Sequence, residues 1–323
     1  MMQWGVKKVV GGLGLLALSA CAPTIAPQAT TPSAQRPQTR VAPPPPAVIV
    51  APKSDSEVDA LRLYYQRLQN DLNTRGLLRL DGGGPDTPFT DTQLARNFVR
   101  IALFDEYVSD GLDLRASPTA SNLRRWEKPV RMSVEFGDQV PATQRAKDRA
   151  EVDAYAKRLS RVTGLPITMT DNAPNYHVLF MGENDRRASE ARLREIVPGI
   201  APSSLRAIIN LPRDQLCIVV AFSEPGKSEY VKAVAVIRDE HPDLLRKSCI
   251  HEELAQGLGL ANDSPAARPS IFNDDEEFGL LTTHDELLLK MLYDRRLQSG
   301  MTPEQAAPIA QIIATEMTGG GAS

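Results

Sequence analysis

The stretch from Ser248 to Asp263 gathers most of the side chains in this sequence that could do chemistry. It reads SCIHEELAQGLGLAND, with one histidine, two adjacent glutamates, a glutamine and a final Asn-Asp pair. A glutamate held on a helix can act as a general base, and imidazole, carboxylate and amide groups can all ligate a divalent metal. The pattern predicts a metal-dependent hydrolytic site, or a site of that shape that has lost its metal.

Spacing decides which of these side chains can share one ion. Glu252 and Gln256 lie one helical turn apart, so they share a face of the helix. His251 and Gln256 are separated by roughly 140° around a regular helix, and only a local π-bulge would aim both at one ion. Zinc prefers imidazole, thiolate or carboxylate, whereas amide oxygens suit calcium or magnesium better.

Two interpretations of the helix stay open. As a site, its candidate general base is Glu253, or Glu252 in an alternative register. The candidate metal ligands, all from the helix or the residues directly after it, are Glu252, Gln256, Asn262, Asp263 and His251. As structure alone, the paired acids would interact with the helix dipole, Gln256 would be a buried amide, and His251 would be an exposed or capping imidazole.

An α+β arrangement must position this helix. Segments with strand character are 130–136, 165–169, 176–181, 216–222 and 231–238. A long helix is predicted over 142–163 and a charged helix over 184–197, and the last two strands, joined by a Pro-Gly turn, suggest an antiparallel hairpin. We therefore expect a mainly five-stranded mixed sheet packed with the long helix and the motif helix of 250–261.

Further helices flank this core at both ends. An apolar stripe predicts a helix over 55–75, and a second helix begins near Thr90 and ends by Gly111. Later, Thr283 to Glu286 predicts a capping box, and Thr302 with Pro303 predicts the start of the last helix. The acids of 273–277 indicate a solvated loop, because they lack the spacing of an EF-hand.

The N-terminus has the pattern of an exported lipoprotein. Two lysines precede an apolar run from Val9 to Ala20, and Leu18-Ser19-Ala20-Cys21 resembles the lipobox of bacterial lipoproteins. The resemblance implies that a signal peptide, residues 1–20, is removed and that Cys21 carries acyl chains, including palmitate. Ala22 after the cysteine favours the outer membrane. The alternative is an ordinary signal peptide with an incidental cysteine.

Composition and low complexity divide the rest of the chain. Residues 21–52 are rich in proline and predict a disordered tether. Residues 53–318 predict a single globular domain with three parts, 53–115, 126–263 and 264–318, followed by a frayed tail at 319–323. Aromatic residues make up 5% of the chain and no basic cluster occurs, which argues against a nucleic-acid partner.

Export also bears on the two remaining cysteines, Cys217 and Cys249. In an oxidising compartment a disulfide between them is favoured, although two buried free thiols are the alternative. The bond would tie a strand to the start of the motif helix, and closing a loop of that length is worth roughly 3–4 kcal/mol in the chain-entropy model.

The order of these elements, ending in a helix that finishes Gly259-Leu260, resembles the N-terminal half of zincin metalloproteases, with their HExxHxxGxxH pattern. Anchored on that pair, the general-base position falls on Glu253. The ligand positions fall on Glu252, Gln256 and Asn262. The resemblance implies a zincin-like fold in which the zinc-binding histidines are replaced.

Residues 90–300 also resemble a family of proteobacterial lipoproteins, the domain of unknown function 2927. The resembling stretches are 97–107, 249–263, 269–275 and 292–297. This second resemblance implies a family without an established activity.

Together these patterns lead us to expect an outer-membrane-anchored periplasmic lipoprotein with a degenerate zincin-like domain. Its role would be non-catalytic, either binding a peptide or envelope protein or supporting the envelope, with no cofactor and with membrane attachment through the acyl chains on Cys21. The alternative is an atypical, peptidase-like metallohydrolase that uses a zinc or calcium ion and a glutamate general base on the 250–261 helix.

Overall fold

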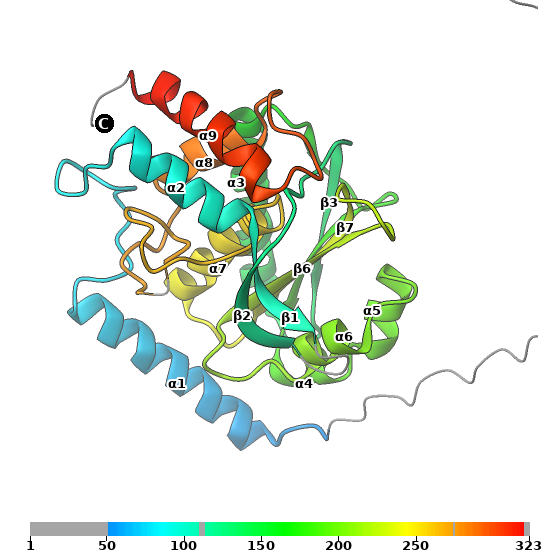
Figure 1. Ribbon diagram of the computed structural model, residues 1–323. Helices are drawn as coiled ribbons and strands as arrows, with labels where there is room; N and C mark the ends of the chain where they lie inside the picture. The colour runs from blue at the N-terminus through cyan, green and yellow to red at the C-terminus, as the bar shows by residue number, and fades with distance from the viewer. Residues whose placement is uncertain (1–50, 110–113, 274, 320–323) are drawn as a thin grey trace, which may run out of the picture. The chain divides into compact units, whose positions relative to one another are not determined.

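A five-stranded mixed sheet lies at the centre of the fold (Figure 1). Its order is β4 (Ile167–Met169), β3 (Val130–Phe136), β5 (Tyr176–Met181), β7 (Tyr230–Arg238) and β6 (Cys217–Ser223). The first four run parallel, and β6 pairs antiparallel with β7 at one edge. The predicted α+β class, the five strands and the terminal hairpin are therefore confirmed.

This computed structural model describes residues 51–109, 114–273 and 275–319, all within one compact unit. The predicted signal peptide, the acylation site Cys21 and nearly all of the 21–52 tether lie outside the described residues, as do residues 320–323 of the predicted frayed tail. Among the helices described, none is both long and apolar enough to cross a membrane.

Helices cover both faces of the sheet because its central strands are apolar on both sides. Along β7, Ala233, Ala235 and Ile237 contribute to the core that contains α3 (Ala142–Thr163) and α7 (Asp243–Gln256). The alternate residues Val234 and Val236 face a second core with α5 (Glu190–Ile196) and α6 (Pro202–Ile209). The period of two along the strand thus decides which helix layer each side chain meets.

The prediction of one continuous helix over 184–197 is wrong, because two short helices form there. The chain forms α4 (Glu183–Arg187) and then α5, with a break at Ala188 and Ser189. The Ser189 hydroxyl donates a hydrogen bond to the Arg186 carbonyl (2.7 Å), which is the competition with helical bonding expected of serine. Helix α6, which begins with Pro202 in its first turn, was not predicted.

The predicted helix from Thr90 to Gly111 is too long. Helix α2 (Asp91–Ala102) ends at Ala102, and the chain continues as β1 (Phe104–Ser109), which pairs antiparallel with β2 (Leu114–Ala120). Apolar spacing in this stretch fits a helix equally well, and pairing with a strand further along the chain decides the outcome.

The remaining helices are α1 (Asp55–Thr74), α8 (Thr283–Leu292) and α9 (Pro303–Thr318). Helix α9 lies beside α2, and α1 crosses the far end of the domain, where Tyr65 packs with Leu245 (Figure 1). The capping box of α8 is formed by Thr282 and Asp285, one residue earlier than predicted for each partner, whereas the predicted start of the last helix at Thr302 and Pro303 is confirmed.

Candidate functional site

The motif helix α7 begins at Asp243 and ends at Gln256, so both predicted bounds, 250 and 261, are wrong. Gly257 begins the turn that follows, and a Cβ there would overlap the Tyr176 hydroxyl. Gly259 adopts φ +127°, a conformation that L side chains rarely adopt, and a Cβ there would meet a backbone carbonyl. The two glycines therefore end the helix and let the turn pack tightly against the sheet.

Buried aromatic side chains fix α7 and this turn by hydrogen bonding to backbone carbonyls. The pairs are Tyr155 with His251 (2.8 Å), Tyr176 with Glu253 (2.8 Å), Trp126 with Gly257 (2.9 Å) and Tyr293 with Leu258 (2.9 Å). Each aromatic ring buries apolar surface and donates one hydrogen bond to a backbone carbonyl of the helix or the turn, and the Glu253 carbonyl also accepts from the Gly257 N–H (3.0 Å). The backbone beneath the candidate site is therefore rigid.

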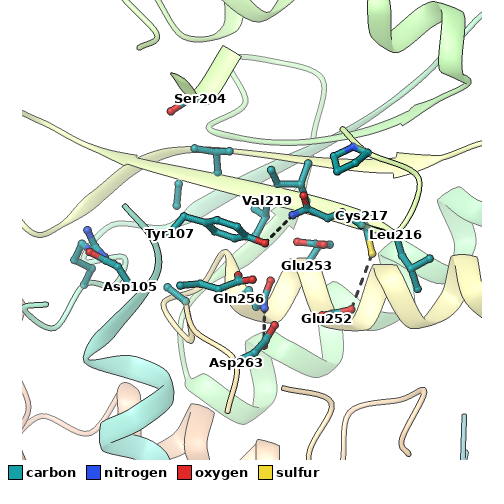
Figure 2. Close-up of a pocket in the computed structure, with 18 of the residues that line it drawn as sticks. Asp105, Tyr107, Ser204, Leu216, Cys217, Val219, Glu252, Glu253, Gln256 and Asp263 are labelled. Carbon is teal, nitrogen blue, oxygen red and sulfur yellow. Dashed lines mark hydrogen bonds and ion pairs between the residues drawn. The ribbon is translucent and has the colours of Figure 1, made fainter. Parts of the chain in front are cut away.

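A cleft of about 630 Å³ opens between α7, the edge strand β6 and strand β1 (Figure 2). Seven carboxyl groups line it: Asp105, Glu106, Asp214, Glu252, Glu253, Asp263 and Glu276. Among the described lining residues the sole basic side chain is Arg124, which forms an ion pair with Asp105. The cleft is therefore strongly acidic.

Glu253 is more deeply buried than the adjacent Glu252, with 3% of its surface exposed. The Val219 backbone N–H of β6 donates to its carboxyl group, whereas Oε2 has no hydrogen-bond partner among the described residues. Burial, followed by the charges of Glu106 and Asp263, raises the pKa of Glu253 well above its usual value. A buried acid of this kind in a cleft is typical of functional sites.

Glu252 is half-buried and lies 4.0 Å from the Cys217 sulfur, measured from Oε2 to Sγ. Burial raises the pKa of its carboxyl group, and the neighbouring Glu253 and then Asp263 raise it further. Two carboxyl groups so close together cannot both ionise at low cost, so the ionisation of one depends on that of the other.

Gln256 and Asp263 complete the same wall of the cleft. The Gln256 side-chain amide donates to Asp263 Oδ1 (3.0 Å), which connects the last turn of α7 to the loop that follows. Asn262 does not line the cleft, because its side-chain amide donates to the Arg100 carbonyl (2.8 Å) at the end of α2. The structure thus brings together Glu252, Glu253, Gln256 and Asp263 and leaves Asn262 outside.

His251 lies on the opposite side of α7 from the cleft. Its ring stacks on Tyr155, with centroids 4.0 Å apart, its Nδ1 accepts from the Leu281 N–H (3.1 Å), and Nε2 lies 3.6 Å from Glu151. Burial lowers the pKa of this imidazole. Successive helical residues point about 100° apart, so the histidine next to Glu252 packs against α3 and is not available to an ion in the cleft.

The predicted disulfide between Cys217 and Cys249 is confirmed, with an S–S distance of 2.01 Å. It joins the edge strand β6 to α7 directly beside the cleft. Within the described part of the chain, one group of three metal-binding side chains has ligand atoms within 4.8 Å of one another: Cys217, Glu252 and Glu253. With the sulfur in a disulfide this set holds two carboxylates, which is too few ligands for catalytic zinc.

Four cleft acids were missed from the sequence: Asp105, Glu106, Asp214 and Glu276. Glu106 lies where the register of β1 shifts against β2, and such bulges often redirect a side chain toward a site. Glu276 adopts φ +57°, which is unusual for a residue with a Cβ. The acidic run of 273–277 was the available signal, and its interpretation as a solvated loop overlooked the cleft beside it.

Comparison with known proteins supplies a family but no activity. No curated protein matches the chain. The family model described as "Protein of unknown function (DUF2927)" matches residues 91–312, a segment that includes every residue that lines the cleft. The chain therefore belongs to this family of proteins of unknown function.

Proposed function

We propose that this chain is an envelope-tethered binding protein whose acidic cleft takes a cationic ligand, namely an extended peptide segment that carries lysine or arginine. The observation that carries the proposal is the set of seven carboxyl groups around the cleft against one arginine that is already paired. Such an excess of one sign attracts and orients ligands of the opposite sign.

The edge strand β6 supports a peptide as the ligand. Its residues 217–221 line the cleft, β7 pairs with one side of it, and no strand among the described residues pairs with the other side. An open edge can accept an extended peptide by backbone hydrogen bonding, while pockets beside it select the side chains. Glu106 across the cleft and Asp263 beside α7 would meet the basic side chains.

A second candidate, a peptidase-like metallohydrolase, draws on one observation. Glu253 is buried next to the strand edge with an unpartnered oxygen, which suits an acid or base acting on a bound peptide. The metal that this candidate needs lacks a matching ligand set while Cys217 is in the disulfide. Binding without hydrolysis is therefore the better proposal.

The cellular setting belongs to the same proposal. Acyl chains on Cys21 would hold the protein at the periplasmic face of the outer membrane, and the proline-rich segment of 21–52 would hold the zincin-like domain away from the lipid surface. The expected partners are then an envelope protein or peptide, and nucleic acid is not expected.

Peptide binding tests the proposal directly. The form that lacks residues 1–21 is titrated, with chelator present, into a fluorescent heptapeptide that alternates lysine with small residues and into a matched glutamate peptide. We expect binding of the lysine peptide alone, weakening as salt is raised. The double substitution Glu106→Gln with Asp263→Asn should weaken it by about tenfold or more.

A matched control removes the same two charges far from the cleft. Glu195→Gln with Asp153→Asn changes exposed carboxylates that pair with neighbouring basic residues on α5 and α3, and it should leave peptide affinity unchanged. Equal weakening by both double variants, or equal binding of the two peptides, would refute a specific role for the cleft.

A further inference from the structure

We propose that Cys217, once released from Cys249, completes a zinc site with Glu252 and Glu253, so that the disulfide decides whether the cleft holds a metal. The inference uses the cleft assigned above to peptide binding, but it does not require that a peptide binds there. It concerns the three side chains that meet where β6 faces α7 (Figure 2).

The three ligand atoms are already close to the spacing that zinc requires. Cys217 Sγ, a Glu252 oxygen and a Glu253 oxygen lie within 4.8 Å of one another, and Sγ is 4.0 Å from Glu252 Oε2. Zinc bonds of about 2.3 Å to sulfur and about 2.1 Å to oxygen in a tetrahedron separate neighbouring ligands by roughly 3.5 Å. Small rotations of the side chains would close the difference, and the fourth position would face the cleft.

Glu253 gives an independent reason to expect a cation here. Its side chain is 97% shielded from solvent in a cleft wall, yet Oε2 has no hydrogen-bond partner among the described residues. A buried polar atom without a partner is costly, and a metal ion is one of the few ligands that would satisfy it. A dication would also offset the repulsion among Glu252, Glu253 and Asp263.

The two sulfurs of the disulfide have different surroundings, which favours Cys217 as the ligand. Cys217 lines the cleft and is 6% exposed, whereas Cys249 is 1% exposed and its Sγ lies 3.7 Å from Nδ1 of the buried His241. Burial holds the pKa of His241 well below its usual value, so the ring is neutral and can accept a hydrogen bond. The reduced Cys249 thiol would donate to His241 while Cys217 remains directed at the two glutamates.

Release of Cys217 requires a dithiol reductant, whose chemistry is that of ordinary thiol–disulfide exchange. One reductant thiolate attacks the Cys217 sulfur from the cleft, forms a mixed disulfide and expels the Cys249 thiolate, which takes up a proton. The second reductant thiol then gives up its proton, which balances the proton taken up by Cys249, and its sulfur forms a bond to the first reductant sulfur and expels the Cys217 thiolate. The reductant loses two electrons to become a cyclic disulfide, and zinc binds the thiolate.

Single cysteine variants test the site without any reductant. Cys249→Ser leaves the Cys217 thiol in the cleft, and Cys217→Ser is the matched control, since it also removes the disulfide but leaves its one thiol beside His241. Both are prepared without residues 1–21 and titrated with cobalt(II). We expect a near-ultraviolet thiolate-to-cobalt charge-transfer band in Cys249→Ser that zinc displaces, and no band in Cys217→Ser.

Adding Glu252→Gln to the Cys249→Ser variant should weaken cobalt binding by on the order of 100-fold, since one of three ligands is lost. Circular dichroism and cooperative thermal unfolding confirm that each variant is folded. If Cys249→Ser does not fold, wild-type protein is reduced with a dithiol, desalted and analysed for bound zinc, with one zinc per chain expected after reduction and none before.

A folded Cys249→Ser variant without the band, equal bands in the two single variants, or reduced wild type that retains no zinc would overturn the proposal. Peptide binding is measured on oxidised wild type in chelator, and cobalt binding on Cys249→Ser without peptide. Failure of either experiment therefore leaves the other result intact.

Discussion

Two buried glutamates in this molecule have opposite surroundings. Glu183, at the start of α4, is 5% exposed and forms ion pairs with Arg186 (2.5 Å), Arg187 (2.8 Å) and Arg238 (3.1 Å). Burial alone would raise the pKa of Glu183, but the arginines, Arg186 first, lower it below its usual value. Glu253 is 3% exposed with acidic neighbours, and its pKa is raised.

The difference is between a buried charge that neighbouring cations balance and like charges that lie together at a cleft. At Glu183 each oxygen contacts a guanidinium group, so the cluster is complete within the protein. Around Glu253 the carboxyl groups repel one another. The elements that carry them are held in place by the Cys217–Cys249 disulfide and by the hydrogen bond from the Tyr176 hydroxyl to the Glu253 carbonyl. Arrangements that cost stability and persist at a cleft are typical of functional sites.

The largest expected effect is on the paired cluster. Glu183→Gln should lower the free energy of unfolding by about 3–5 kcal/mol, because Arg186 and Arg238, each 1% exposed, would lose the charge that balances them. Urea unfolding followed by circular dichroism measures the change. The control Glu190→Gln breaks a more exposed pair with Arg194 and should cost less than about 1 kcal/mol. An equal loss of unfolding free energy in both variants would show that the buried cluster around Glu183 is no more important for stability than an exposed ion pair.

Glu253→Gln should act in the opposite direction and stabilise the protein by about 1 kcal/mol or more near neutral pH. The pKa of Glu253 is raised in the folded state, so above its usual value of 4.5 the unfolded chain releases its proton first. Wild-type stability should therefore fall as pH increases from about 4.5 toward the raised pKa, and the advantage of the glutamine variant should grow over that range.

Unfolding of both proteins at several pH values from about 2 to 8 checks the predicted direction of this pH dependence. Glu151 provides an internal contrast, since hydrogen bonding to His251, and then to Lys247, lowers its pKa to about 2. The stability that Glu151 contributes to the folded state is fully present above pH 4.5 and is lost as the pH falls toward about 2. A Glu253→Gln variant that is destabilised throughout the range would show that Glu253 is a structural partner instead.

The smallest effect is expected at Glu276. Its φ of +57° costs a residue with a Cβ about 1–2 kcal/mol, part of which glycine regains despite its greater loss of entropy on folding. Glu276→Gly should therefore stabilise the protein by about 0.5–1 kcal/mol and weaken binding of the lysine peptide. Ala173→Gly, at φ +47° and outside the cleft lining, should give the stability gain alone. Loss of stability in Glu276→Gly with unchanged peptide affinity would contradict a binding role.

Elements whose sequence pattern is complete within a few residues were predicted well, and boundaries that depend on distant contacts were not. The strands, α3 and the terminal helices have regular apolar spacing within a few residues, so their positions agree closely with the expectation. The boundary after Ala102 and the break at Ser189 depend on a distant strand and a side-chain hydrogen bond, and were missed. The zincin resemblance and the lipoprotein anchor remain predictions.

Sequence alone determined which helix would carry the candidate site and that the chain is α+β, and it favoured a disulfide between Cys217 and Cys249. Those conclusions rest on periodicity, on helix-ending glycines and on the expectation that the chain is exported. Only the tertiary structure decided which side chains meet, because the cleft is assembled from β1, β6, α7 and the 276 loop, which are distant in sequence. It directed His251 toward α3, Asn262 toward α2, and Glu106 and Glu276 into the cleft, where burial and neighbouring carboxyl groups raise the pKa values of Glu252 and Glu253.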